Sequence, residues 1–137
     1  MVRDLVPKPP YFRNAVLAFI FGGLVCVFGQ FFTDVYRITF HMSSKEAGNP
    51  AVATMIFIGA LLTGLGVFDK IARYAGAGLA VPVTGFANSI VASALEFKKE
   101  GLVFGVGSKM FLLAGSPITF GVVTAFVVGL IYALFVF

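Results

Sequence analysis

Apolar residues gather in four long windows of this chain, and charged residues lie between the windows. The windows free of Asp, Glu, Lys and Arg cover residues 14–33, 47–68, 74–95 and 110–137. Each reaches the roughly 20 residues that a helix needs to cross a hydrocarbon core of about 30 Å. The pattern therefore predicts an all-α integral membrane protein with about four transmembrane spans.

The windows also predict how the chain is organised. We expect a basic N-terminal arm over residues 1–13 and a single polytopic membrane domain over residues 14–137. Spans are predicted at 14–33, 50–68, 75–95 and 117–137, with a short broken segment at 101–115. A polar loop at 34–48 separates the first two spans. Pro50 suits the start of the second span, because the first helical position needs no N–H donor.

Glycine and proline interrupt the later part of the chain, where a continuous helix would least favour them. One group comprises Gly76, Gly78, Pro82 and Gly85, and a second group comprises Gly105, Gly107, Gly115 and Pro117. Backbone groups freed by a break survive at membrane depth only when they are buried in protein or line a wet cavity. Such breaks supply binding sites in transport proteins. We therefore expect one or two spans, above all 75–95, to be broken or re-entrant and to line a protected path. Tight packing without any transport role is the alternative.

Composition agrees with a membrane protein and argues against a nucleic-acid partner. Hydrophobic residues make up 59% of the chain and charged residues 12%, whereas soluble domains carry about a quarter charged residues. The net charge is +4, but the basic residues lie at the ends of apolar windows and form no groove-reading stripe. Lysines and arginines in such places set topology and contact anionic lipid headgroups.

Few side chains could carry catalytic or metal chemistry. Cys26 is the only cysteine and lies within an apolar window, and His41 is the only histidine. The sequence contains no paired-carboxylate, HExxH or serine–histidine–acid pattern. It therefore indicates neither an enzyme nor a metal site, and we expect no cofactor.

Four small polar residues recur on one side of the helix expected after Pro82. They are Thr84, Asn88, Ser89 and Ser93, at relative positions i, i+4, i+5 and i+9. They indicate either a pore-facing or ligand-facing wall, or hydrogen bonds between helices, which such residues supply routinely in membranes.

Lys109 places an ammonium group among apolar residues. A charge at membrane depth usually faces a partner, a cavity or an ion path, and Asp69, Glu96 and Glu100 are the available acidic partners. The alternative is that Lys109 extends to a lipid headgroup from a short hairpin.

Three strings resemble the SpoVAC (stage V sporulation protein AC) membrane proteins of the SpoVA family. They are "KPPYFRNAVLAFIFGGLVCVFGQ", "GNPAVATMIFIGALLTGLGVFDKIARYAGAGLAVPVTGFANSI" and "ALEFKKEGLVFGVGSKMFLLAGSPITFGVV". Within them, "AGAG-x-AVPVTGFANS" is the most specific, and SpoVAE-type relatives carry a similar string. The resemblance covers residues 7–133.

The resemblance implies a channel-forming subunit in the inner membrane of the bacterial endospore. It implies transport of dipicolinic acid, with calcium, into the forespore during sporulation and outward during germination. Its implied partners are a SpoVAE-type membrane relative and a soluble, thiolase-like SpoVAD protein. Dipicolinate is a small planar dianion, which suits helix N-termini, backbone amides and a lysine. A chain with about four spans has little interior, so we expect the path to lie between subunits.

Two other functions stay open on the sequence. A tension-gated channel with little ligand selectivity would use the same glycine-rich helices. A non-conducting membrane scaffold for a soluble partner would depend on the loops at 34–48 and 96–101 rather than on the polar residues.

Overall fold

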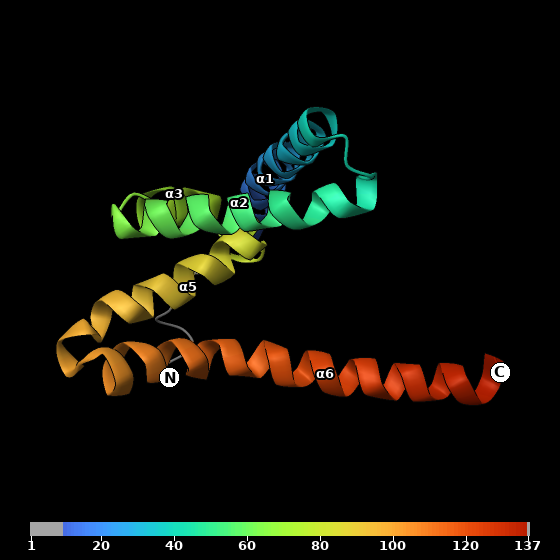
Figure 1. Ribbon diagram of the computed structural model, residues 1–137. Coiled ribbons are helices and arrows are strands. Elements are labelled where there is room, and N and C mark those ends of the chain that lie inside the picture. Colours follow the sequence, from blue (N-terminus) through green and yellow to red (C-terminus); the bar gives the residue numbers. More distant parts are fainter. Residues whose placement is uncertain (1–9, 137) are drawn as a thin grey trace. The chain divides into compact units, whose positions relative to one another are not determined.

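The computed structural model describes residues 10–136, and all regular elements within that range are helices (Figure 1). Residues 1–9 of the predicted basic arm, and Phe137, lie outside the described range. Three of the described helices are long and apolar enough to cross a membrane: Tyr11–Phe40, Ser44–Gly64 and Leu102–Phe135. The predicted all-α membrane fold is therefore confirmed. The chain divides into two compact units, the first up to Asn88 and the second from Ser89.

The first helix, α1 (Tyr11–Phe40), extends past both ends of the predicted span at 14–33. Its last turns contain residues that pair along the helix surface. The amide of Gln30 donates to the carboxylate of Asp34 at 3.2 Å, and the guanidinium of Arg37 lies 3.9 Å from that carboxylate. These i, i+4 and i, i+3 pairs support a helix where polarity alone indicated a loop.

The second helix, α2 (Ser44–Gly64), begins ahead of the predicted start at Pro50. The hydroxyl of Ser43 accepts a hydrogen bond from the N–H of Glu46 at 3.4 Å, and the N–H of Ser43 donates to the Glu46 carboxylate at 3.1 Å. This capping box pairs N–H groups that a helix start otherwise leaves open. Only residues 41–43 link α1 to α2, so the predicted loop at 34–48 is wrong.

Three shorter helices follow: α3 (Phe68–Ala75), α4 (Ala77–Ala80) and α5 (Val83–Glu96). Gly76 lies between α3 and α4 with a φ of 55°, a conformation that costs glycine nothing because it has no Cβ. Val81 and Pro82 lie between α4 and α5, where the missing N–H of proline weakens helix continuation. The segment expected to be broken at 75–95 is thus interrupted at two places.

Close backbone contacts hold this interrupted segment against the long helices of the first unit. A Cβ added at Gly78 would fall on the carbonyl oxygen of Ala18 and within 2.8 Å of the backbone nitrogen of Gly22. A Cβ added at Gly59 would lie 3.0 Å from the carbonyl oxygen of Thr84. The backbone of α4 therefore packs directly on α1, and the start of α5 packs directly on α2, as small residues permit in membranes.

A buried polar contact also joins α2 to α5. Thr63 is 7% exposed, and its hydroxyl donates to the carbonyl of Gly59 at 2.7 Å. The same hydroxyl lies 2.8 Å from the side-chain oxygen of Asn88. Asn88 is therefore engaged by another helix of its own unit.

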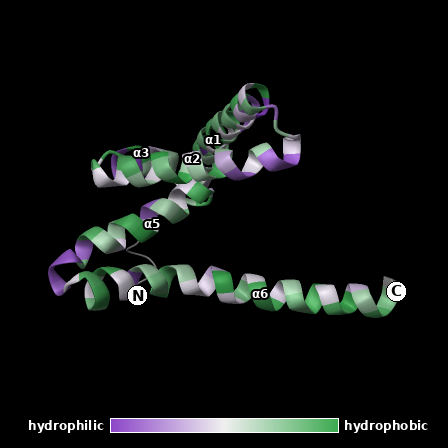
Figure 2. Cartoon of the chain, in the orientation of Figure 1, coloured by the Kyte–Doolittle hydropathy of each residue, from purple (hydrophilic) through white to green (hydrophobic). Residues whose placement is uncertain are grey.

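The buried side chains are mostly small and lie in the first unit. Its buried apolar residues are Ala47, Ala51, Met55, Phe68, Ala75, Leu79 and Ala87. Large apolar side chains are instead exposed along the long helices. Figure 2 shows that most of α1 and α6 is hydrophobic. An apolar surface of this extent is what lipid chains would cover.

The second unit continues from α5 through two short elements, η1 (Lys98–Glu100) and the π-helix η2 (Leu102–Gly107), into α6 (Ser108–Val136). Gly101 turns the chain with a φ of 96°. A Cβ at Gly105 would fall on the carbonyl oxygen of Phe97, so glycine permits a tight hairpin at this place.

The predicted break at Gly115 and Pro117 is wrong, because both residues lie inside α6. The segments predicted at 101–115 and 117–137 form one apolar stretch, Leu102–Phe135. Transmembrane helices tolerate proline when neighbouring groups re-pair the freed carbonyl. Ending the helix there would free more backbone groups in lipid than one proline does.

We expect Gly78→Ala to destabilise the first unit, because the new methyl group has no space against the α1 backbone. Overpacking of this kind costs about 1–3 kcal/mol. The control is Gly23→Ala, since a Cβ at Gly23 meets nothing within 4 Å. Thermal unfolding in detergent, followed by circular dichroism, should show a lower midpoint for Gly78→Ala alone. Equal midpoints for the two variants would contradict the close contact.

We expect Thr63→Val and Asn88→Ala to be coupled in stability, because each removes one side of the same contact. The double variant should lose less unfolding free energy than the sum of the single variants, by about 0.6 kcal/mol. Ser93→Ala serves as the control, since the hydroxyl of Ser93 donates to the carbonyl of Ile90 in its own helix at 3.1 Å. Additive losses for Thr63 and Asn88 would show that the contact does not form.

Candidate functional site

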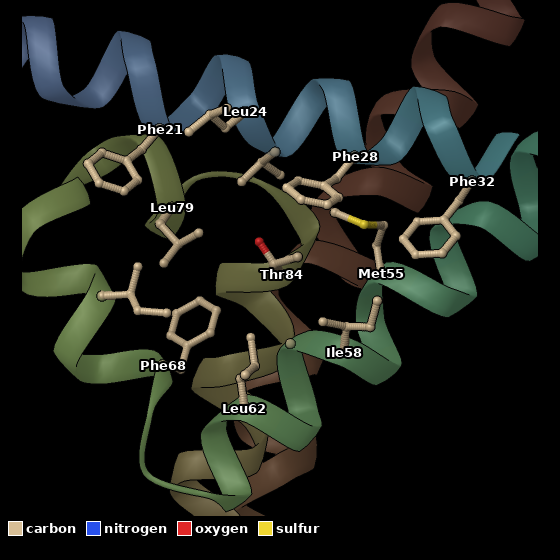
Figure 3. A pocket seen from close by; sticks show the side chains of 13 residues that line it. Phe21, Leu24, Phe28, Phe32, Met55, Ile58, Leu62, Phe68, Leu79 and Thr84 are labelled. Carbon is tan, nitrogen blue, oxygen red and sulfur yellow. The ribbon is translucent and has the colours of Figure 1, made fainter. Parts of the chain in front are cut away.

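The first unit contains an apolar cavity of about 340 Å³ between its helices (Figure 3). Thirteen residues line it: Phe21, Leu24, Val25, Phe28, Phe32, Met55, Ile58, Gly59, Leu62, Phe68, Ile71, Leu79 and Thr84. They come from α1, α2, α3, α4 and α5, so the interrupted segment closes a space that the two long helices leave open.

Thr84 brings the one hydroxyl to this lining. Its side chain is 5% exposed, and Oγ1 has no hydrogen-bond partner in the described part of the chain. Figure 3 shows this oxygen pointing into the space between the labelled side chains. Thr84 was predicted as a ligand-facing residue, and the structure places it against an apolar cavity rather than a polar one.

The other residues of the predicted polar stripe on α5 differ in their surroundings. Asn88 contacts Thr63 on α2, and Ser93 is partly buried and bonds to its own helix. Ser89 is exposed. The contact of Asn88 is one between helices, as the second interpretation of the pattern expects, whereas the hydrogen bond of Ser93 lies within α5.

The predicted helix-break residues take different positions. In the first unit, Gly76 and Pro82 interrupt the chain, while Gly78 and Gly85 are buried where another backbone comes close. In the second unit, Gly105 and Gly107 belong to η2. Gly115 and Pro117 are ordinary positions of α6. Within the described residues, each unit therefore contains an interrupted segment, with breaks at Gly76 and Pro82 in the first unit and the hairpin at η1 and η2 in the second.

Lys109 lies in the first turn of α6, and its Nζ is 4.4 Å from the centroid of the Phe97 ring. This cation–π contact stabilises the ammonium group. Within residues 10–136, no carboxylate, including those of Glu96 and Glu100, lies within ion-pair distance of Lys109. The stretch Leu102–Phe135 has 34 residues, more than the roughly 20 that a span needs. Lys109 therefore has an aromatic partner and lies near one end of a long apolar helix.

A second cavity, of about 410 Å³, carries the polar groups that the first one lacks. It is lined by Asn14, Ala15, Ala18, Arg73, Tyr74, Gly76 and Ala77. Within the described residues, Arg73 makes no ion pair. Its guanidinium can present a planar pair of donors to a carboxylate or phosphate.

Sequence reasoning missed this second cavity. The sequence pattern placed Arg73 among the basic residues at the ends of the apolar windows and gave no binding role to Asn14. The available signal was an arginine three positions before a glycine suspected of breaking the helix. The other side of the cavity, from Asn14 to Ala18 on α1, is too distant from Arg73 in the sequence for residue spacing to indicate that the two lie together.

Comparisons with known proteins agree with the resemblance seen in the sequence. Residues 14–131 match the family model described as "SpoVAC/SpoVAEB sporulation membrane protein". The chain is 56% identical over 130 residues to stage V sporulation protein AC of Bacillus subtilis (strain 168), which covers 95% of this chain and 87% of that protein. No solved structure matches the chain significantly. The chain belongs to the SpoVAC/SpoVAEB family of sporulation membrane proteins.

Proposed function

We propose that this membrane protein is a channel-forming subunit for dipicolinic acid in the inner membrane of the endospore. It moves the acid, with calcium, into the forespore and releases it during germination. It works with a SpoVAE-type membrane relative and a soluble, thiolase-like SpoVAD protein. Family membership supports the sporulation role, and the cavity at Arg73 supports an anionic substrate.

The observation that carries the proposal is an arginine beside an interrupted helix. Arg73 and Gly76 line the same cavity of about 410 Å³. Dipicolinate carries two carboxylates on a planar ring. A guanidinium can bind one carboxylate through two parallel hydrogen bonds, and the ring of Tyr74 offers a flat apolar face.

The apolar cavity does not suit this substrate. Its lining contains no cationic side chain, and a bare carboxylate is very costly to place in an apolar space. The apolar cavity is therefore not part of the proposed path. The proposed path lies between subunits, with the cavity at Arg73 as one part of its wall. Ser89, exposed on α5, is a further proposed wall residue.

We expect Arg73→Gln to lower dipicolinate flux in liposomes by about tenfold, because a charge-assisted pair of hydrogen bonds is lost. Flux should be measured with this chain alone and with its SpoVAE-type relative. The control is Lys70→Gln, which removes an equal charge from the same helix outside the cavity. Arg73→Lys keeps the charge without the planar pair of donors. Its flux should lie between those of Arg73→Gln and Lys70→Gln.

The outcomes separate the competing functions. Equal losses in the Arg73 and Lys70 variants would indicate a general charge effect instead of a site. Flux that responds to osmotic downshift and ignores Arg73→Gln would favour a tension-gated channel. Absence of flux from both preparations, with assembly intact, would favour a scaffold.

Lys109 is proposed as a second cation for the acid, in the second unit. Lys109→Gln should lower flux, whereas Lys109→Arg should preserve most of it, because arginine keeps both the charge and the contact with the Phe97 ring. Lys99→Gln, in the exposed hairpin, is the matched control. If Lys109→Gln leaves the dipicolinate flux unchanged, the lysine has no role in transport and serves only at the membrane surface.

A further inference from the structure

The apolar cavity of the first unit has the size and lining of a ligand site. Its volume of about 340 Å³ lies within the range of small-molecule pockets, which are mostly apolar with a few polar groups that orient the ligand. Dipicolinate is excluded because the lining lacks a cation. Water is also a poor occupant, since a buried water needs two to four polar partners and the lining offers one hydroxyl.

The lining residues indicate an elongated space. On α1 they run from Phe21 to Phe32, a distance of about 16 Å at the rise of an α-helix. On α2 they run from Met55 to Leu62 with helical spacing. A space that follows two helices in this way fits a chain-like ligand better than a compact one.

Thr84 supplies an independent indication of a ligand. Its hydroxyl is buried, unpartnered and directed into the cavity. A buried hydroxyl without a partner is costly, and the stiff χ1 angle of threonine restricts any reorientation. An oxygen carried by the ligand would remove this cost.

The position of Thr84 relative to α2 indicates which oxygen of a lipid could accept a hydrogen bond from its hydroxyl. The Thr84 backbone contacts Gly59, which precedes the end of α2 at Gly64 by about 8 Å of helix. The charged residues Asp69, Lys70 and Arg73 follow shortly after that end. The oxygen that a lipid acyl chain carries nearest to that charged end is its ester oxygen, which links the chain to the lipid backbone.

We propose that the cavity binds an acyl chain of a membrane lipid and that the hydroxyl of Thr84 donates a hydrogen bond to its ester oxygen. The chain lies between α1 and α2, against Met55, Phe68 and Leu79. This site is distinct from the cavity at Arg73, and it holds whether or not the protein carries dipicolinate.

The test uses the full chain in nanodiscs that contain a phospholipid with a diazirine in its acyl chain. After illumination, mass spectrometry of the digested protein locates the label. Met55, Phe68 and Leu79 are 8%, 2% and 9% exposed, so bulk lipid hardly reaches them. We expect label on these three residues as well as on the half-exposed Leu61. Label on Leu61 without label on the other three residues would overturn the proposal. This result is also expected if a second copy of the chain, instead of a lipid, covers the cavity.

Matched variants on α2 test whether the cavity itself holds the chain. Leu62→Phe adds volume inside the cavity, and Leu61→Phe makes the same change on a residue outside its lining. The label on Met55 should fall about fivefold or more in Leu62→Phe alone, since overpacking opposes occupancy. On α1, Val25→Phe changes a residue of the cavity lining and Val27→Phe changes a residue outside it. This second pair keeps the test valid if one of the α2 variants misfolds. Equal labelling of Met55 within both pairs would overturn the proposal.

The role of Thr84 is tested by competition. A fatty acid methyl ester should displace the label from Met55 about fivefold better than the alkane of equal length, as expected for one hydrogen bond. This preference should disappear in Thr84→Val, which keeps the shape, and remain in Thr84→Ser. A preference unchanged in Thr84→Val would show that the hydroxyl does not orient the ligand.

Discussion

The first unit depends on one constraint, which is that a helix interrupted at membrane depth must have its backbone covered by protein. The covering comes from close contacts at glycine. Gly78 brings α4 onto the α1 backbone, and Gly59 brings the start of α5 onto α2. Since hydrocarbon offers no hydrogen bonds to freed N–H and C=O groups, these contacts are what permits breaks at Gly76 and Pro82. The two cavities of the unit follow from this arrangement.

The interruption also creates two cavities of opposite character. Where α4 and α5 close the space between the long helices, large apolar side chains meet and leave a cavity with a single hydroxyl, that of Thr84. Where α3 ends and α4 approaches the start of α1, Arg73 and Asn14 line a polar cavity instead. The proposed acyl chain and the proposed anion therefore have separate cavities within one small unit.

Different contacts hold the second unit together. Its hairpin is tight because Gly105 lies against the Phe97 carbonyl, and the Phe97 ring holds the ammonium of Lys109. Beyond it, α6 presents apolar side chains, and none of its described side chains from Ser108 to Phe135 is buried. The family match covers residues 14–131, so it extends over both units, and the long apolar helix belongs to the family as much as the interrupted segment does.

The sequence by itself determined the class of the protein, because uncharged windows of spanning length have no other stable environment than lipid. It also determined the interruptions at Gly76 and Pro82, since backbone chemistry there is local. It misjudged Gly115 and Pro117, because a proline within a long apolar stretch is tolerated when ending the helix would expose more backbone. Only the tertiary structure decided which residues the polar side chains contact. The contact of Asn88 with Thr63, and the cavity that Arg73 and Asn14 both line, arise between helices far apart in the chain, which spacing along one helix does not encode.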